Sequence, residues 1–161
     1  MHRVAQFVGH LTARVHPREM ALVRRVLPPS AVALFDAMPV ADRRHGLDVA
    51  QRLVREGVDD PDLLAAALLH DAAKGRAMRL WHRVAGVLLE AVRPSLLERL
   101  ATPDTRSWRH GFHLYLHHGP MSADAALAAG CPPRVAAFIR GTPAASDAAL
   151  AAALRAADDA S

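Results

Sequence analysis

Residues 60–75 read Asp60-Pro-Asp-Leu-Leu-Ala-Ala-Ala-Leu-Leu-His-Asp-Ala-Ala-Lys-Gly75. The stretch opens with a capping aspartate and a proline at the first helical position, and it closes on a glycine that can stop a helix. Residues 63–69 are all Ala or Leu, which are strong helix formers. A helix that is apolar on every side is buried. We therefore expect a buried central helix over residues 61–73, with His70 and Asp71 close to its end.

The composition of the whole chain agrees with a helical fold. Apolar residues make up 52% of the 161 residues, but aromatic residues only 4%, so the core is built from Ala, Leu and Val. We predict an all-α fold, a single-domain helical bundle. Prolines, glycines and capping residues divide the chain into expected helices at residues 3–15, 17–27, 30–38, 42–56, 61–73, 77–92, 94–100, 104–118, 122–130, 132–141 and 146–161.

The chain shows no internal repeat and no linker. We expect residues 1–38 to be an N-terminal helical extension packed on a domain of residues 39–161. Asp42 is predicted to cap the helix of residues 42–56. The two tryptophans, Trp81 and Trp108, are expected to anchor the core, and His82 is expected at the surface.

Cysteine content and hydropathy bear on the location of the protein. Cys131 is the only cysteine, so the chain forms no internal disulfide, which fits a reducing compartment. The N-terminus lacks the apolar region of a signal peptide, and no apolar run approaches the ~20 residues that span a bilayer. These features predict a soluble, cytoplasmic protein without a membrane partner.

The basic residues are almost all arginine. Arginine supplies nineteen of the twenty, and the formal net charge is +4. The arginines are scattered, and no basic run is interleaved with aromatics, so nucleic acid is not an expected partner. The single lysine, Lys74, follows His70 and Asp71 by one helical turn.

The pair His70–Asp71 places a nitrogen ligand beside an oxygen ligand on an otherwise apolar helix. Adjacent helical residues point about 100° apart, so both reach one ion only at a helix end or in a tight pocket. Burying Asp71 unpaired costs several kcal/mol, which a metal or another cation offsets. Alternatively, Asp71 caps or forms a local salt bridge, and His70 donates to a backbone carbonyl. The residue types alone favour neither interpretation.

Three segments together resemble the HD-domain superfamily of metal-dependent phosphohydrolases, over roughly residues 40–161. Arg44-His45-Gly-Leu-Asp-Val-Ala50 is similar to the family's R-H-x-x-x-V-A helix. Leu64 to Gly75 is close to its A-A-L-L-H-D-I-G-K element, and Ala157-Asp158 matches its final aspartate. The extended second element is the most specific of the three, since a His-Asp pair alone is common.

The resemblance implies a helical HD-type bundle with a divalent ion between His45, His70, Asp71 and Asp158. Ligand type does not distinguish Mn, Fe, Co, Ni, Mg and Zn. The implied activity is hydrolysis of a phosphomonoester or phosphodiester in a small phosphorylated substrate, with nucleotides among the candidates. Asp71 would also orient the attacking water, and Lys74 would bind the phosphate as a point charge.

Further residues suit a second metal ion or the substrate. His118 resembles the family's histidine ahead of P-x-x-G, and His117 lies beside it; a polar helix end explains them equally well. His113 and His117 have the i, i+4 spacing that chelates a metal. Arg44 is a second candidate for phosphate contact, although a solvated arginine on a helix face is the simpler interpretation.

The next histidines of the family pattern are missing. They follow a helix like residues 133–140, where this chain reads Gly141-Thr142-Pro143. We therefore predict one tightly held metal ion at most. Two alternatives remain. The first is a degenerate HD-type domain with a binding or regulatory role, and the second is a helical protein without metal, in which His45 and Asp158 lie far from His70. No signal in the sequence sets the substrate or the oligomeric state.

Overall fold

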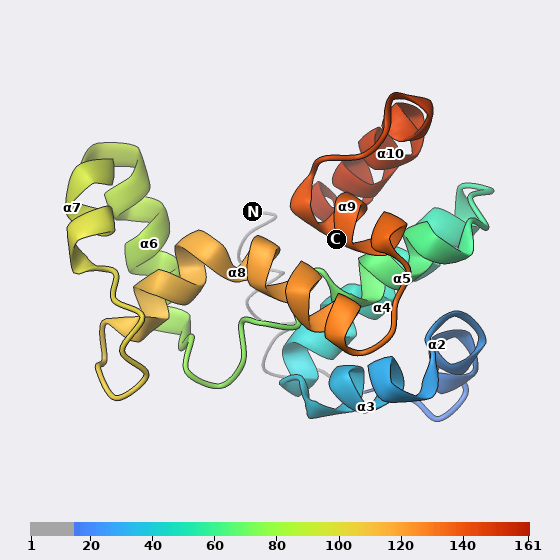
Figure 1. The fold of residues 1–161 in the computed structure, drawn as a ribbon, viewed down its shortest axis with the longest axis horizontal. Coiled ribbons are helices and arrows are strands. Elements are labelled where there is room, and N and C mark those ends of the chain that lie inside the picture. The colour runs from blue at the N-terminus through green and yellow to red at the C-terminus, as the bar shows by residue number, and fades with distance from the viewer. Residues whose placement is uncertain (1–14) are drawn as a thin grey trace.

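A computed structural model describes residues 15–161 (Figure 1). This part of the chain contains helices and no strand, which confirms the predicted all-α class. The expected helix of residues 3–15 lies outside the described residues, apart from Val15. The α-helices are α2 (Met20–Val26), α3 (Pro29–Ala37), α4 (Val40–Arg55), α5 (Pro61–Leu69), α6 (Leu80–Val92), α7 (Pro94–Leu100), α8 (His110–Ala128), α9 (Pro133–Arg140) and α10 (Ala148–Asp159), and a 3₁₀ turn covers Ala145–Asp147.

Helix α5 is the centre of the fold, as its sequence predicts. All residues from Leu63 to Leu69 are buried. Asp60 caps the helix by accepting a hydrogen bond from the Leu63 N–H at 3.0 Å, and Pro61 follows at the first position. Helices α2, α4, α8, α9 and α10 all contact α5 (Figure 1). Apolar burial on every side therefore holds α5 in place.

The described part of the N-terminal extension belongs to the core. Val23 of α2 and Phe35 of α3 are fully buried, in one cluster with Leu47 of α4 and Leu64 of α5. The extension is therefore more than a loosely attached arm, because α2 and α3 complete the apolar core around α5.

Helix α8 is longer than the sequence predicts. Two helices were expected, at 104–118 and 122–130, but one helix runs from His110 to Ala128 through Pro120. Proline removes one backbone hydrogen bond, and its ring disfavours helical geometry in the preceding residue. That residue is Gly119, which has no Cβ to clash. Burial of Ser122, Ala123 and Ala126 beyond the proline offsets the lost bond.

The start of α4 also differs from the prediction. Pro39 occupies the capping position, and Asp42 lies in the first turn without making a cap. The Asp42 side chain is 1% exposed, and its Oδ1 accepts a hydrogen bond from Arg83 Nη2 of α6 at 2.7 Å. A buried carboxylate requires such a partner, so this ion pair ties α4 to α6.

Helices α6 and α7 pack together at one end of the molecule, far from α10, and α8 connects them to the body (Figure 1). Here two expectations are wrong. Trp81 and Trp108 are 43% and 61% exposed, so they do not anchor the core, whereas His82 is buried. His82 Nδ1 accepts from the Arg79 N–H, and Nε2 donates to the Trp108 carbonyl at 2.7 Å, so His82 joins two segments of the chain.

Within residues 15–161, no helix combines the length and the apolar character needed to cross a membrane.

Candidate metal centre

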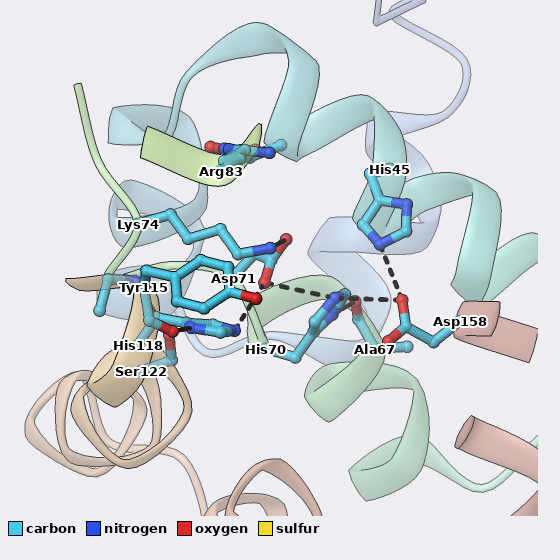
Figure 2. Close-up of polar contacts among 12 residues, drawn as sticks. His45, Ala67, His70, Asp71, Lys74, Arg83, Tyr115, His118, Ser122 and Asp158 are labelled. Carbon is cyan, nitrogen blue, oxygen red and sulfur yellow. Dashed lines mark hydrogen bonds and ion pairs between the residues drawn. The ribbon is translucent and has the colours of Figure 1, made fainter. Parts of the chain in front are cut away.

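Three of the four predicted ligands converge on one point (Figure 2). His45 comes from the middle of α4, His70 follows the last residue of α5, and Asp158 lies in the last turn of α10. One ligand atom of each residue lies within 4.8 Å of the others. The Nε2 atom of His45 is 2.8 Å from Asp158 Oδ1, and that of His70 is 3.5 Å from the same oxygen. Chain segments 113 residues apart thus meet at this point.

The fourth predicted ligand, Asp71, faces the same place. Its Oδ1 is 3.5 Å from His70 Nε2. Two ligands that each lie ~2.0–2.2 Å from one ion are separated by roughly 3–3.5 Å in tetrahedral or octahedral geometry. The His70–Asp71 and His70–Asp158 separations agree with that spacing. His45, His70 and Asp158 could therefore hold one divalent ion, and Asp71 lies next to this group.

The end of α5 explains how adjacent residues both reach the cluster. The expected helix of residues 61–73 stops at Leu69, and tight i→i+3 turns follow, with Lys74 N–H bonded to the Asp71 carbonyl at 3.0 Å. Gly75 lies within these turns at φ +55°, a conformation that favours glycine. Ser122 of α8 fixes the turn by accepting a hydrogen bond from the Ala73 N–H at 2.9 Å.

A backbone hydrogen bond fixes the orientation of the His70 ring. Its Nδ1 donates to the Ala67 carbonyl at 2.9 Å, which leaves Nε2 directed at Asp71 and Asp158 (Figure 2). Metal-binding histidines in proteins are held in this way, by a hydrogen bond from the second ring nitrogen. The sequence had left open whether His70 donates to a carbonyl or binds a metal. The structure contains the carbonyl bond, and this bond prepares the ring for a ligand role.

Asp71 is the most deeply buried member of the cluster, with its side chain 2% exposed. Lys74 Nζ lies 2.5 Å from Oδ2, so the local salt bridge considered from the sequence is present. The Oδ1 atom is buried and has no hydrogen-bond partner. A buried carboxylate oxygen without a partner is costly. An ion between the four side chains would satisfy it, which is the strongest structural indication that the residues suit a metal.

The carboxylates dominate the electrostatics of the cluster. Burial lowers the pKa of His70, but Asp71 and Asp158 outweigh it and raise the pKa to about 9. Burial raises the pKa of Asp71, and the positive charges of His70 and Lys74 reverse the effect and bring it to about 2. The pKa of Asp158 is also well below its ordinary value, because its bonds to His45 and His70 outweigh burial. Two ionised carboxylates thus face two imidazoles, and a proton on His70 supplies part of the positive charge that an ion would bring.

Of the candidates for a second metal or for substrate, only His118 faces the cluster. Its Nδ1 donates to the Tyr115 carbonyl at 3.0 Å, and its Nε2 lies 3.8 Å from Asp71 Oδ1 (Figure 2). Burial and the charge of Lys74 lower the pKa of His118, which keeps its ring neutral and able to accept. His117 is exposed, and its ring packs at a tilt against that of His113 instead.

Arg44 is neither solvated nor directed at a phosphate site. Its guanidinium binds Glu19 at 2.7 Å and Asp48 at 2.8 Å, with the Arg44 side chain 18% exposed. Burial raises the pKa of Glu19, but hydrogen bonds from Arg44, His16 and Gln51 lower it to about 2. Arg44 therefore attaches the chain ahead of α2 to α4.

Three histidines of α8 form a second group, here called the α8 stripe: His110, His113 and His117. The ring centroids of His110 and His113 are 5.7 Å apart, and those of His113 and His117 are 4.5 Å apart. These distances confirm that the three rings lie along one side of a helix. Burial and the two neighbouring rings lower the pKa of His113.

Two residues that position the centre were missed from the sequence. Gly46 follows His45, and a Cβ there would lie 2.9 Å from the Leu68 carbonyl oxygen. Glycine therefore lets α4 approach the backbone of α5, which brings His45 to His70. A glycine within a helical pattern usually has such a packing reason, and this was the available signal. Ser122, fully buried, carried no comparable signal.

Comparisons of the chain with protein-family models, with curated proteins and with solved structures found no match.

Proposed function

We propose that the chain is a metal-dependent phosphohydrolase of the HD-domain type, with one divalent ion held by His45, His70, Asp71 and Asp158. The observation that carries the proposal is the convergence of His45 and Asp158 on His70. The third interpretation of the sequence, a metal-free helical protein, required these residues to lie apart, and they are in contact.

A bound divalent ion would supply Lewis acidity, polarising a phosphoryl oxygen and lowering the pKa of bound water. The chain's own groups have complementary roles. Asp71 is ionised at neutral pH, so its carboxylate can orient a water molecule or accept a proton from it. Lys74, 18% exposed and 2.5 Å from Asp71, places a positive charge beside the Asp71 carboxylate, where it could meet a phosphate bound at the ion.

Access to the cluster supports a small substrate. Exposure rises from Asp71, at 2%, through His70, at 16%, to Asp158, at 42%. The ligands are therefore anchored in the core and open to solvent on the side of α10. A phosphate group can enter from that side, while His118 lies on the α8 side next to Asp71. We propose a small phosphorylated substrate, such as a nucleotide.

The proposal is tested with Asp71→Ala and a panel of phosphomonoesters and phosphodiesters assayed with Mn²⁺, Co²⁺, Ni²⁺, Mg²⁺ or Zn²⁺. We expect the wild-type chain to hydrolyse at least one substrate and the variant to lose both turnover and bound metal. Hydrolysis that survives in Asp71→Ala would reject the assignment. His117→Ala is the matched control, because His117 lies outside the cluster.

The Lys74–Asp71 pair also favours a second candidate, a degenerate HD-type domain that binds a partner or ligand without turnover. An ion pair at 2.5 Å supplies the charge that a metal would otherwise bring, so the fold tolerates the absence of an ion. Lys74→Arg separates the two candidates, since it keeps the charge and changes the geometry. Lost hydrolysis with retained metal supports the enzyme, whereas a panel with no hydrolysed substrate supports the degenerate domain.

A further inference from the structure

Helix α6 has one strongly apolar side, and that side is exposed. His82 and Gly86 face α8, where a Cβ at Gly86 would lie 2.8 Å from the Tyr115 ring. The opposite side, here called the α6 face, is exposed to between 41% and 76% per residue and consists of Leu80, Trp81, Val84, Val87, Leu88 and Val92, with Trp108 beside it. The apolar side of an amphipathic helix normally packs against another surface, and this face lacks such a partner within residues 15–161.

The spacing within the α6 face is that of a helix pair. Four exposed residues follow one another at intervals of four, three and four positions: Leu80, Val84, Val87 and Ala91. This is the repeat by which two helices pack side by side along a shared seam. Trp81 and Leu88 widen the seam on one flank.

The size of the α6 face suits a second protein surface. Seven large apolar side chains with these exposures present several hundred Å² of apolar area, near the ~800 Å² that each partner contributes to a standard interface. Trp81 is also held in position, because it stacks on His82 at 3.6 Å between ring centroids and contacts Trp108 at 5.8 Å. Ordered tryptophans are frequent centres of binding energy in interfaces.

We propose that the α6 face pairs with the α6 face of a second copy of this chain, antiparallel about a twofold axis. Charge supports the antiparallel direction. Arg83 and Glu90 lie on one flank of the seam, each one residue before a seam position, and internal bonds to Asp42 and Tyr115 hold both in place. When Leu80 of one copy packs opposite Ala91 of the other, Arg83 comes to face Glu90. A parallel pair would instead place Arg83 opposite the apolar Leu88.

This pairing leaves the metal centre open. The centre opens to solvent at Asp158 of α10. Helix α6 is joined to α4 through Arg83 and Asp42 and runs towards the end of the molecule far from α10 (Figure 1). The inference therefore stands independently of the proposed hydrolase activity.

Sedimentation equilibrium of the full chain from about 1 to 100 µM tests the proposal. We expect the mass to rise towards that of a dimer, and Leu88→Glu to shift the equilibrium to monomer by at least about tenfold in Kd, because it places a charge in the interface. Leu127→Glu is the matched control, as Leu127 is 37% exposed on α8, outside the face. Circular dichroism checks that both variants remain helical.

Two further readouts locate the interface. Both tryptophans of the chain lie in the α6 face, so their emission should shift to the red on dilution of the wild type and stay red in Leu88→Glu. A mixture of Leu80→Cys and Ala91→Cys chains should form disulfide dimers between the two variants, and Leu80→Cys alone should not.

A wild-type chain that stays monomeric throughout, or a dimer that Leu88→Glu leaves intact, overturns the proposal. A monomer that binds vesicles of anionic lipid would assign the face to a lipid surface. A monomer whose tryptophan emission is already blue-shifted would show that another segment of the same chain covers the α6 face.

Discussion

Two groups of histidines lie on the described part of this protein, and they differ in their neighbours. His45 and His70 meet the carboxylates of Asp71 and Asp158, which raise the pKa of His70 to about 9. In the α8 stripe the rings lie against one another, and burial together with the neighbouring rings lowers the pKa of His113. Negative charge thus surrounds the first group, whereas burial and the neighbouring rings disfavour a proton on His113 in the second. Histidine spacing alone therefore does not identify a metal centre, and the carboxylates decide.

The largest expected effect is on metal affinity. Asp158→Ala should weaken Mn²⁺ binding by at least about 100-fold, because it removes one ligand and one of the two negative charges. Isothermal titration calorimetry measures the affinity. His113→Ala, in the α8 stripe, should leave it unchanged. Equal losses in the two variants would mean that the ion binds elsewhere.

Removing the Lys74 side chain should lower the stability of the metal-free protein. Lys74→Ala leaves Asp71 charged and buried without the partner that bonds its Oδ2, so we expect the metal-free protein to lose about 3 kcal/mol in the free energy of unfolding. Saturating Mn²⁺ should restore most of this loss. Urea denaturation with and without the ion provides the measurement. A loss that Mn²⁺ does not repair would show that Asp71 is not a ligand.

The approach of α4 to α5 provides a third test. Gly46→Ala places a Cβ 2.9 Å from the Leu68 carbonyl oxygen, so the two helices must separate, at a cost of roughly 1–3 kcal/mol. Because His45 is the next residue, metal affinity should fall together with stability. Thermal unfolding and Mn²⁺ titration of the same sample measure both. Full affinity in a destabilised variant would show that the position of His45 does not depend on this contact.

The smallest effect concerns the α8 stripe. The folded-state pKa of His113 is below its ordinary value, so the unfolded chain binds more protons as the pH falls through about 6.5. Stability should therefore decrease with acidification through this range. In His113→Gln, the fall in Tm between pH 8 and pH 5 should be slightly smaller than in the wild type. A larger fall in the variant would contradict the repulsion between the rings.

Much of this arrangement can be predicted from the sequence, and the failures have physical causes. The apolar run of α5 and its Asp60–Pro61 start identify a buried helix, because local propensity and burial agree there. The division of α8 was wrong because Pro120 is a strong local signal that tertiary burial overrides. The prediction that Trp81 and Trp108 anchor the core was wrong. Their apolar character favours burial, but it does not say whether the chain's own core or another surface covers them.

The metal centre was predictable only in part. Four candidate ligands were predicted through the resemblance to a family. The structure groups His45, His70 and Asp158 and places Asp71 beside His70. The Asp42–Arg83 pair and the bond from Ala73 to Ser122 join residues far apart in the chain, and neither follows a spacing rule. Such contacts depend on how the helices pack against one another, and that packing cannot be inferred from a single sequence.

The most direct test is a crystal of the wild-type protein soaked in Mn²⁺ and measured for anomalous scattering. The account predicts one strong peak, within ~2.0–2.3 Å of His45 Nε2, His70 Nε2, Asp71 Oδ1 and Asp158 Oδ1, and no peak of comparable height at the α8 stripe. A strong peak at His113 and His117 with none between the four ligands would contradict it.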